Sequence, residues 1–86
     1  MQRRESSLIE TLRLVRGAGD AGADVRKIVG QAERILRISQ RTARGYLEDL
    51  KVRGWISIRF GICRATIAGD AELKQANVTE AKEISA

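Results

Sequence analysis

The chain has 86 residues, of which 43% are apolar, 3% are aromatic and 31% are charged, with a formal net charge of +5. This length and composition predict one modest globular domain. No apolar run approaches the roughly 20 residues that cross a bilayer, and the first residues lack the apolar stretch of a signal peptide. We therefore expect no membrane partner and a cytoplasmic location.

Histidine is absent and Cys63 is the only cysteine. These facts exclude a zinc site of cysteine and histidine, an internal disulfide, and the general base that enzymes use most often. A lone cysteine on a predicted strand is typically a small buried residue, and a reactive or intermolecular thiol is the alternative. We expect no metal and no cofactor.

Basic charge is concentrated in the first part of the chain. Residues 1–67 contain 14 Lys and Arg against 7 Asp and Glu, whereas residues 68–86 contain 2 against 4. Most of the basic residues are arginines, whose planar guanidinium suits phosphates and guanine edges. This distribution favours a nucleic acid as partner, with general solubility as the alternative explanation.

Apolar residues at helical spacing predict two helices in the first half of the chain. The first covers residues 6–16, with Ser6 or Ser7 as its N-cap and Gly17 at its end. After a loop of small residues, Asp24 can cap the second helix, which reaches residue 36. The apolar positions of these two helices are Leu8, Ile9, Leu12 and Val15, and then Val25, Ile28, Val29, Ala32, Ile35 and Leu36.

Ser39 is the predicted N-cap of a third helix that runs through Arg53 and ends before Gly54. Two short strands follow, at 55–59 and 62–67, joined by a turn at Phe60 and Gly61. Alternation places Ile56, Ile58 and Phe60 on one side of the first strand and Trp55, Ser57 and Arg59 on the other. The apolar side of the third helix consists of Ala43, Tyr46, Leu47 and Leu50.

A last helix is predicted to start at Gly69 and Asp70. The elements therefore follow the order helix, helix, helix, strand, strand, helix, which indicates a mainly α chain with a small β-hairpin, of the α+β class. We assign residues 1–69 to the domain itself and residues 70–86 to a C-terminal helix.

The segment 37–56 (RISQRTARGYLEDLKVRGWI) resembles the recognition-helix segment of winged helix-turn-helix proteins. The closing Ala-Thr-Ile-Ala-Gly-Asp is similar to the sequence that starts the helix after the wing in those proteins. The resemblance covers about residues 6–80 and is greatest to small archaeal winged-helix regulators, including those of archaeal viruses and plasmids. It implies a winged helix-turn-helix fold and binding to double-stranded DNA.

Angular spacing of about 100° per residue puts polar side chains of the third helix on one exposed flank. There, Arg41 and Arg44 can each contact guanine or phosphate, and Gln40 can read adenine. Glu48 can accept from cytosine or orient Arg44 through an i,i+4 pair. The alternative is a solvated charged face. The flank consists of Gln40, Arg41, Arg44, Glu48 and Lys51.

Further basic residues lie outside the third helix. Arg59 and Arg64 flank the tip of the hairpin, where they can reach the sugar-phosphate backbone or the adjacent minor groove. Arg26 and Lys27 open the second helix, where basic side chains often touch phosphate. Plain solvent exposure is the alternative for all four residues.

The last helix carries a thin apolar stripe. In proteins of the resembled family, a helix after the wing often pairs with its twin, so we expect a homodimer through this stripe. Two recognition helices would then bind half-sites about 10 bp apart, or a multiple of that distance. The predicted dimer contacts are Leu73, Ala76, Asn77, Ala81 and Ile84.

The sequence thus predicts a DNA-binding protein, most simply a transcriptional regulator without a small-molecule effector. A winged-helix module that binds another protein in a larger assembly is the alternative. An enzyme is not expected, because histidine, a paired-carboxylate pattern and a nucleophile motif are all missing. Trp55 and Tyr46 are expected to pack in the core rather than to stack on bases.

Overall fold

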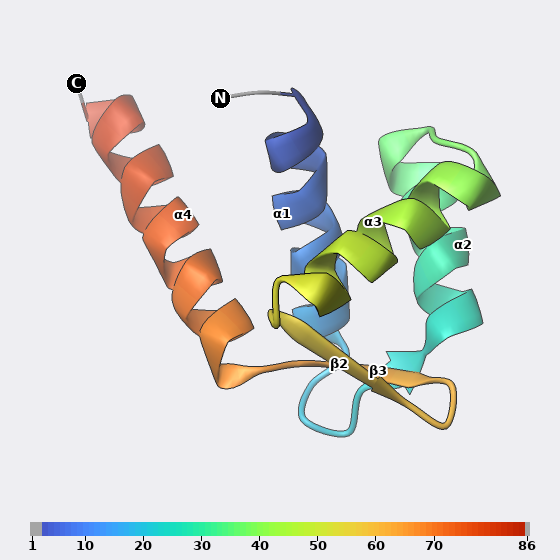
Figure 1. Ribbon diagram of the computed structural model, residues 1–86. Helices are drawn as coiled ribbons and strands as arrows, with labels where there is room; N and C mark the ends of the chain where they lie inside the picture. Colours follow the sequence, from blue (N-terminus) through green and yellow to red (C-terminus); the bar gives the residue numbers. More distant parts are fainter. Residues whose placement is uncertain (1–2, 86) are drawn as a thin grey trace.

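The computed structural model describes residues 3–85, and the side chains of residues 4–76. Its described elements are α1 (Arg3–Gly17), β1 (Ala23–Asp24), α2 (Val25–Leu36), α3 (Gln40–Val52), β2 (Ile56–Arg59), β3 (Ile62–Ala65) and α4 (Ile67–Ser85). Figure 1 shows α1, α2 and α3 gathered above a small sheet, with α4 beside α1. The predicted mainly α chain with a small sheet is confirmed, and β1 is an additional strand.

Two of the predicted helix starts are confirmed by their capping hydrogen bonds. The Asp24 carboxylate accepts from the backbone N–H of Arg26 at 2.8 Å, and the Ser39 hydroxyl oxygen accepts from that of Thr42 at 3.1 Å. Each bond satisfies one of the N–H groups that a helix leaves without an internal partner. At the other end of α3, Gly54 has φ +78 and closes the helix, as predicted.

The predicted starts of α1 and α4 are wrong by a few residues. α1 begins at Arg3 instead of after Ser6 or Ser7, because ion pairs to α3 hold its first turn in place. α4 begins at Ile67, because Thr66 acts as the cap: its hydroxyl donates to the Gly54 carbonyl at 2.6 Å and accepts from the Gly69 N–H at 3.1 Å.

The sheet has three antiparallel strands in the order β1-β3-β2. Ile56 is paired with Ala65 and Ile58 with Cys63 in the hairpin, and Ala23 is paired with Cys63 on the other edge. Gly22 permits this second pairing, because a Cβ there would lie 2.6 Å from the Cys63 carbonyl oxygen. The sequence did not indicate β1, since two residues are too short to show a strand period.

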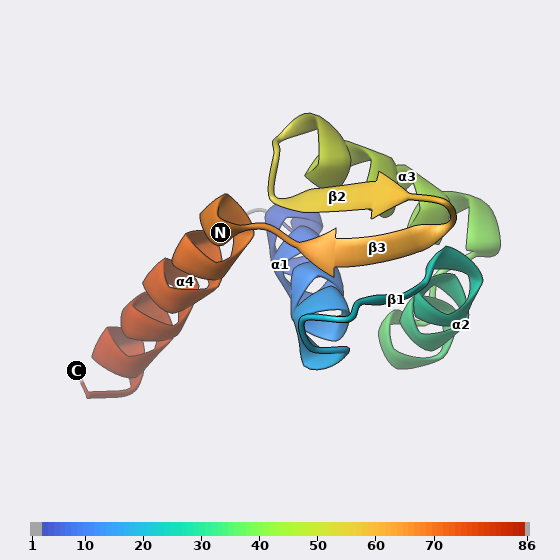
Figure 2. The same cartoon turned by 90° about the horizontal axis from the view of Figure 1, so that it is seen from below.

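The three N-terminal helices and the inner face of the sheet enclose one core. Figure 2 shows the sheet in front of these helices. Trp55 and Ile58 are half-buried against this core, and Tyr46 is buried in it. The buried Cys63 thiol donates to the Ala23 carbonyl at 3.4 Å, and burial raises the pKa of this thiol. The largest side chains that are almost fully buried include Leu8, Leu12, Val15, Ile28 and Leu50.

α4 is attached to this body by its first turns. The Leu73 side chain is only 8% exposed and packs in the core, with Ala76 half-buried against it. The Arg16 Nε lies 2.8 Å from the Asp70 carboxylate and so links α1 to α4. Leu73 and Ala76 were predicted as dimer contacts, but they are engaged within the chain. The other predicted contacts, Asn77, Ala81 and Ile84, lie outside the side chains that the structure describes.

Candidate nucleic-acid interface

The packing of α3 fixes which of its side chains face solvent. Ala43, Tyr46, Leu47 and Leu50 are buried against α1, α2 and the sheet. The helix is therefore anchored along one side over its whole length. Its opposite side carries Gln40, Arg41, Arg44, Gly45, Glu48, Lys51 and Val52, all of which are exposed.

These seven residues are called the α3 face below. With about 100° per residue, Arg41, Gly45, Glu48 and Val52 form its outermost line, and Arg44 and Lys51 lie on one flank. Val52 is 77% exposed, and its position was not predicted as part of the site. A helical projection continued to the end of α3 would have found it on the line of Arg41.

The cations of the α3 face have no carboxylate partner among the described side chains. No ion pair within residues 4–76 involves Arg41, Arg44 or Lys51. The predicted pair of Arg44 with Glu48 is not formed. Three positive charges therefore remain available on this face, against the single carboxylate of Glu48.

Two arginines where α1 meets the end of α3 are engaged in ion pairs. Arg53 donates through its Nη atoms to Glu5 at 2.8 and 3.1 Å and through Nε to Asp49 at 2.9 Å. Arg4 donates to the same Asp49 at 3.1 Å. The hydrogen bonds to Asp49 hold the pKa of its carboxyl group below the ordinary value, and the bond from Arg53 has the largest effect. The guanidinium of Arg53 also lies 5.0 Å from the centre of the Trp55 ring.

A shallow hollow connects the α3 face with the hairpin. Arg44 and Glu48 line it together with Leu47, Val25 from the start of α2, and Ile58 from β2, and its volume is about 150 Å³. The flank of α3 that carries Arg44 thus continues directly onto β2. A ligand that lies along α3 would meet the hairpin at this point.

Arg59 and Arg64 lie on the outer face of the hairpin, away from the core. Arg59 is exposed, and Arg64 is exposed while its Nε donates to the Ala21 carbonyl at 3.2 Å. They share with Ser57 and Ile62 a second hollow of about 320 Å³ that reaches the turn at Phe60. Phe60 does not follow the predicted alternation with Ile56 and Ile58, because the turn begins at this residue and leaves its side chain fully exposed.

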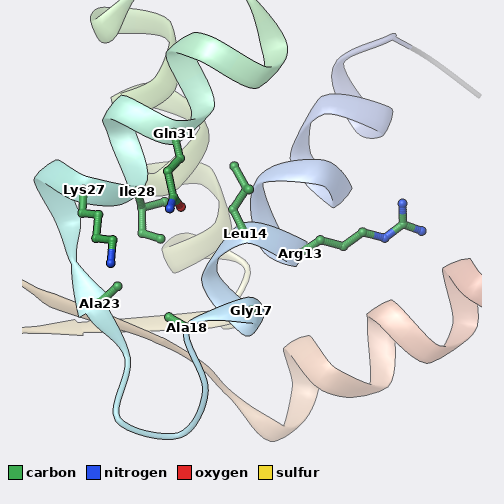
Figure 3. A pocket seen from close by; sticks show the side chains of 8 residues that line it. All are labelled: Arg13, Leu14, Gly17, Ala18, Ala23, Lys27, Ile28 and Gln31. Carbon is green, nitrogen blue, oxygen red and sulfur yellow. The ribbon is translucent and has the colours of Figure 1, made fainter.

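The two predicted site residues of α2 are not among the residues that line the hollow between the α3 face and the hairpin. Arg26 is hydrogen-bonded through Nε and Nη2 to the Asp24 carboxylate at 3.3 and 3.2 Å, which lowers the pKa of Asp24. Val25 lines the hollow beside the α3 face, and Lys27 lies about 200° around the helix from it, on the other side of α2. Lys27 lines a pocket of about 280 Å³ between α2 and the end of α1 (Figure 3), where Arg13 points away from the cavity.

Comparison with protein-family models, with curated proteins and with solved structures gives no match. Among the side chains at residues 4–76, no three His, Cys, Asp or Glu residues come together as metal ligands. Within the described part of the chain, no helix has the length and apolar character that a membrane-spanning segment requires.

Proposed function

We propose that this chain is a winged-helix protein that binds double-stranded DNA and regulates transcription, with α3 in the major groove and the β2–β3 hairpin against the DNA backbone. The observation that supports this proposal most strongly is the charge of the α3 face. Its cations are exposed and without a carboxylate partner among the described residues, while Arg4, Arg16, Arg26 and Arg53 are all paired with acids. A basic face without neutralising carboxylates is better explained by a polyanionic ligand than by simple exposure to solvent.

The shape of the α3 face agrees with a groove ligand. A helix with side chains is about 10–12 Å across, and the major groove is about 12 Å wide. Arg41 and Arg44 have the planar fork that matches the O6 and N7 atoms of guanine, and Val52 offers an apolar contact for a thymine methyl group. Lys51 and the hairpin arginines are suited to phosphates, which position a protein on the duplex.

Gly45 provides a test that separates this proposal from a merely solvated face. No atom lies within 4 Å of a Cβ added at Gly45 or at Gly30 in α2. Both Gly→Ala substitutions should therefore stabilise the free protein by about 0.5–1 kcal/mol. Only Gly45→Ala, on the outermost line of α3, should weaken binding to duplex DNA, by about tenfold, which corresponds to 1.4 kcal/mol.

Thermal unfolding measures the change in stability. The change in binding is measured by mobility shift, with a duplex that the unaltered protein has selected from a random-sequence library. A Gly45→Ala protein that is more stable but binds the duplex as tightly as Gly30→Ala would contradict the placement of α3 in a groove. Absence of duplex binding at low salt by the unaltered protein would overturn the proposal as a whole.

Two exposed apolar residues favour a second candidate, a module that binds another protein. Ile67 is 90% exposed and Val52 is 77% exposed, and an apolar partner surface would cover such side chains. Recovery of a stoichiometric protein partner without nucleic acid would support this candidate. A homodimer through α4 is compatible with the first proposal, and a DNA footprint repeated at about 10 bp would reveal it.

A further inference from the structure

The turn at the hairpin tip contains a residue that the backbone geometry does not favour. Phe60 has φ +53 and Gly61 has φ +74, so both residues of this two-residue turn are left-handed, as in a type I′ turn. Asn-Gly is the preferred pair for that turn, because a short polar side chain tolerates the left-handed region. A bulky phenylalanine at such a position is an outlier.

The same residue gains nothing by packing within the chain. Phe60 is fully exposed, whereas Trp55 is half-buried and Tyr46 is buried. An unfavourable backbone conformation and an aromatic ring in water both count against Phe60 in the free protein. Strained residues of this kind concentrate where a protein contacts its ligands.

The tip is held in a fixed place and has a basic setting. The Val25 N–H donates to the Gly61 carbonyl at 2.8 Å, which attaches the turn to the start of α2. Arg59 precedes Phe60, and Arg64 lies with them around the hollow on the outer face of the hairpin. Figures 1 and 2 show this tip at the end of the molecule opposite α4. An exposed ring that lines the same hollow as two arginines is suited to a ligand that combines apolar and anionic parts.

Resting on the proposed function, we propose that the Phe60 ring inserts into the minor groove of the duplex that α3 binds, where it packs on deoxyribose and partly unstacks a base step. Arg59 and Arg64 then lie on the flanking phosphates. Apolar wedges act on DNA in this way when basic residues hold them at the groove. The wedge adds a preference for steps that unstack easily, such as TA and CA, without a hydrogen bond to any base.

The substitution Phe60→Asn tests the wedge, because it removes the ring and installs the pair that a type I′ turn prefers. The folded protein should be at least as stable as before, while its affinity for a 25-bp duplex falls about tenfold. In duplexes with 2-aminopurine placed at successive positions, the unaltered protein should raise the emission at one step, and Phe60→Asn should not. Ile67→Ser removes another exposed apolar side chain, at the start of α4, and should change neither readout.

Equal duplex affinity and equal 2-aminopurine emission for Phe60→Asn and the unaltered protein would overturn the wedge and leave the DNA proposal intact. Failure of the unaltered protein to bind any duplex would overturn both. As a last comparison, binding of both proteins to vesicles of anionic and neutral lipid is measured. Loss of vesicle binding, with duplex binding unchanged in Phe60→Asn, would assign the ring to a membrane surface and refute the wedge.

Discussion

The junction between the hairpin and α4 makes Gly69→Ala the most informative substitution for the fold. A Cβ at Gly69 would lie 2.1 Å from the Trp55 carbonyl oxygen and 3.0 Å from its carbon, whereas ordinary contact begins near 3.4 Å. Both atoms belong to the backbone of Trp55, so neither can turn aside as the end of a flexible side chain could. The first turn of α4 must therefore move away from Trp55.

This movement has a calculable cost. It strains or breaks the hydrogen bond from the Thr66 N–H to the Trp55 carbonyl at 2.9 Å, which is worth about 1 kcal/mol. Overpacking typically costs a further 1–3 kcal/mol, and the better helix propensity of alanine returns up to about 1 kcal/mol. We expect a net loss of about 2 kcal/mol, or roughly 10 °C in the unfolding midpoint of a domain of this size.

Urea and thermal unfolding followed by far-UV circular dichroism measure this loss. Gly30→Ala is the matched control, because it makes the same change within a helix where a Cβ meets open space. The two substitutions should have opposite signs. A Gly69→Ala protein as stable as the unaltered chain would refute the close approach of α4 to Trp55.

Two further predictions concern ionisable side chains. The pKa of Asp49 is lowered in the folded chain, so its charged form stabilises the fold above the ordinary carboxyl pKa of about 3.9, and this contribution is lost as the pH falls through the lower folded value. Asp49→Asn should be less stable at pH 7 and lose less stability on acidification, and parallel acid limbs in urea titrations would contradict this. The Cys63 thiol is buried with a raised pKa, so a chromogenic disulfide reagent should label it only as the chain unfolds; immediate labelling of native protein would show the burial to be wrong.

Local signals in the sequence were sufficient for most of the helices and for the α3 face. Asp24 and Ser39 cap their helices through their own side chains, and a side-chain oxygen before an apolar period can be recognised without tertiary information. The exposure of Arg41 and Arg44 likewise follows from the helical period, once the apolar side of α3 is known.

Features that depend on distant partners could not be predicted. The ion pairs of Arg53 with Glu5 and of Arg4 with Asp49 join residues more than 40 positions apart, so the engagement of these two arginines could not be read from the sequence. β1 exists only because β3 lies beside it. The outward position of Phe60 follows from the turn that interrupts the alternation of the strand.

Duplex binding measured against salt, for Arg41→Ala, Arg44→Ala and Arg34→Ala, tests the central proposal most directly. Arg34 is exposed on α2, about 180° around that helix from Val25, and serves as the control. We predict that each α3 substitution costs about 1–3 kcal/mol of binding free energy if it reads a base, or reduces the salt slope by about one if it contacts phosphate, while Arg34→Ala stays close to the unaltered protein. Equal and small losses for all three variants would contradict the assignment of the α3 face to DNA.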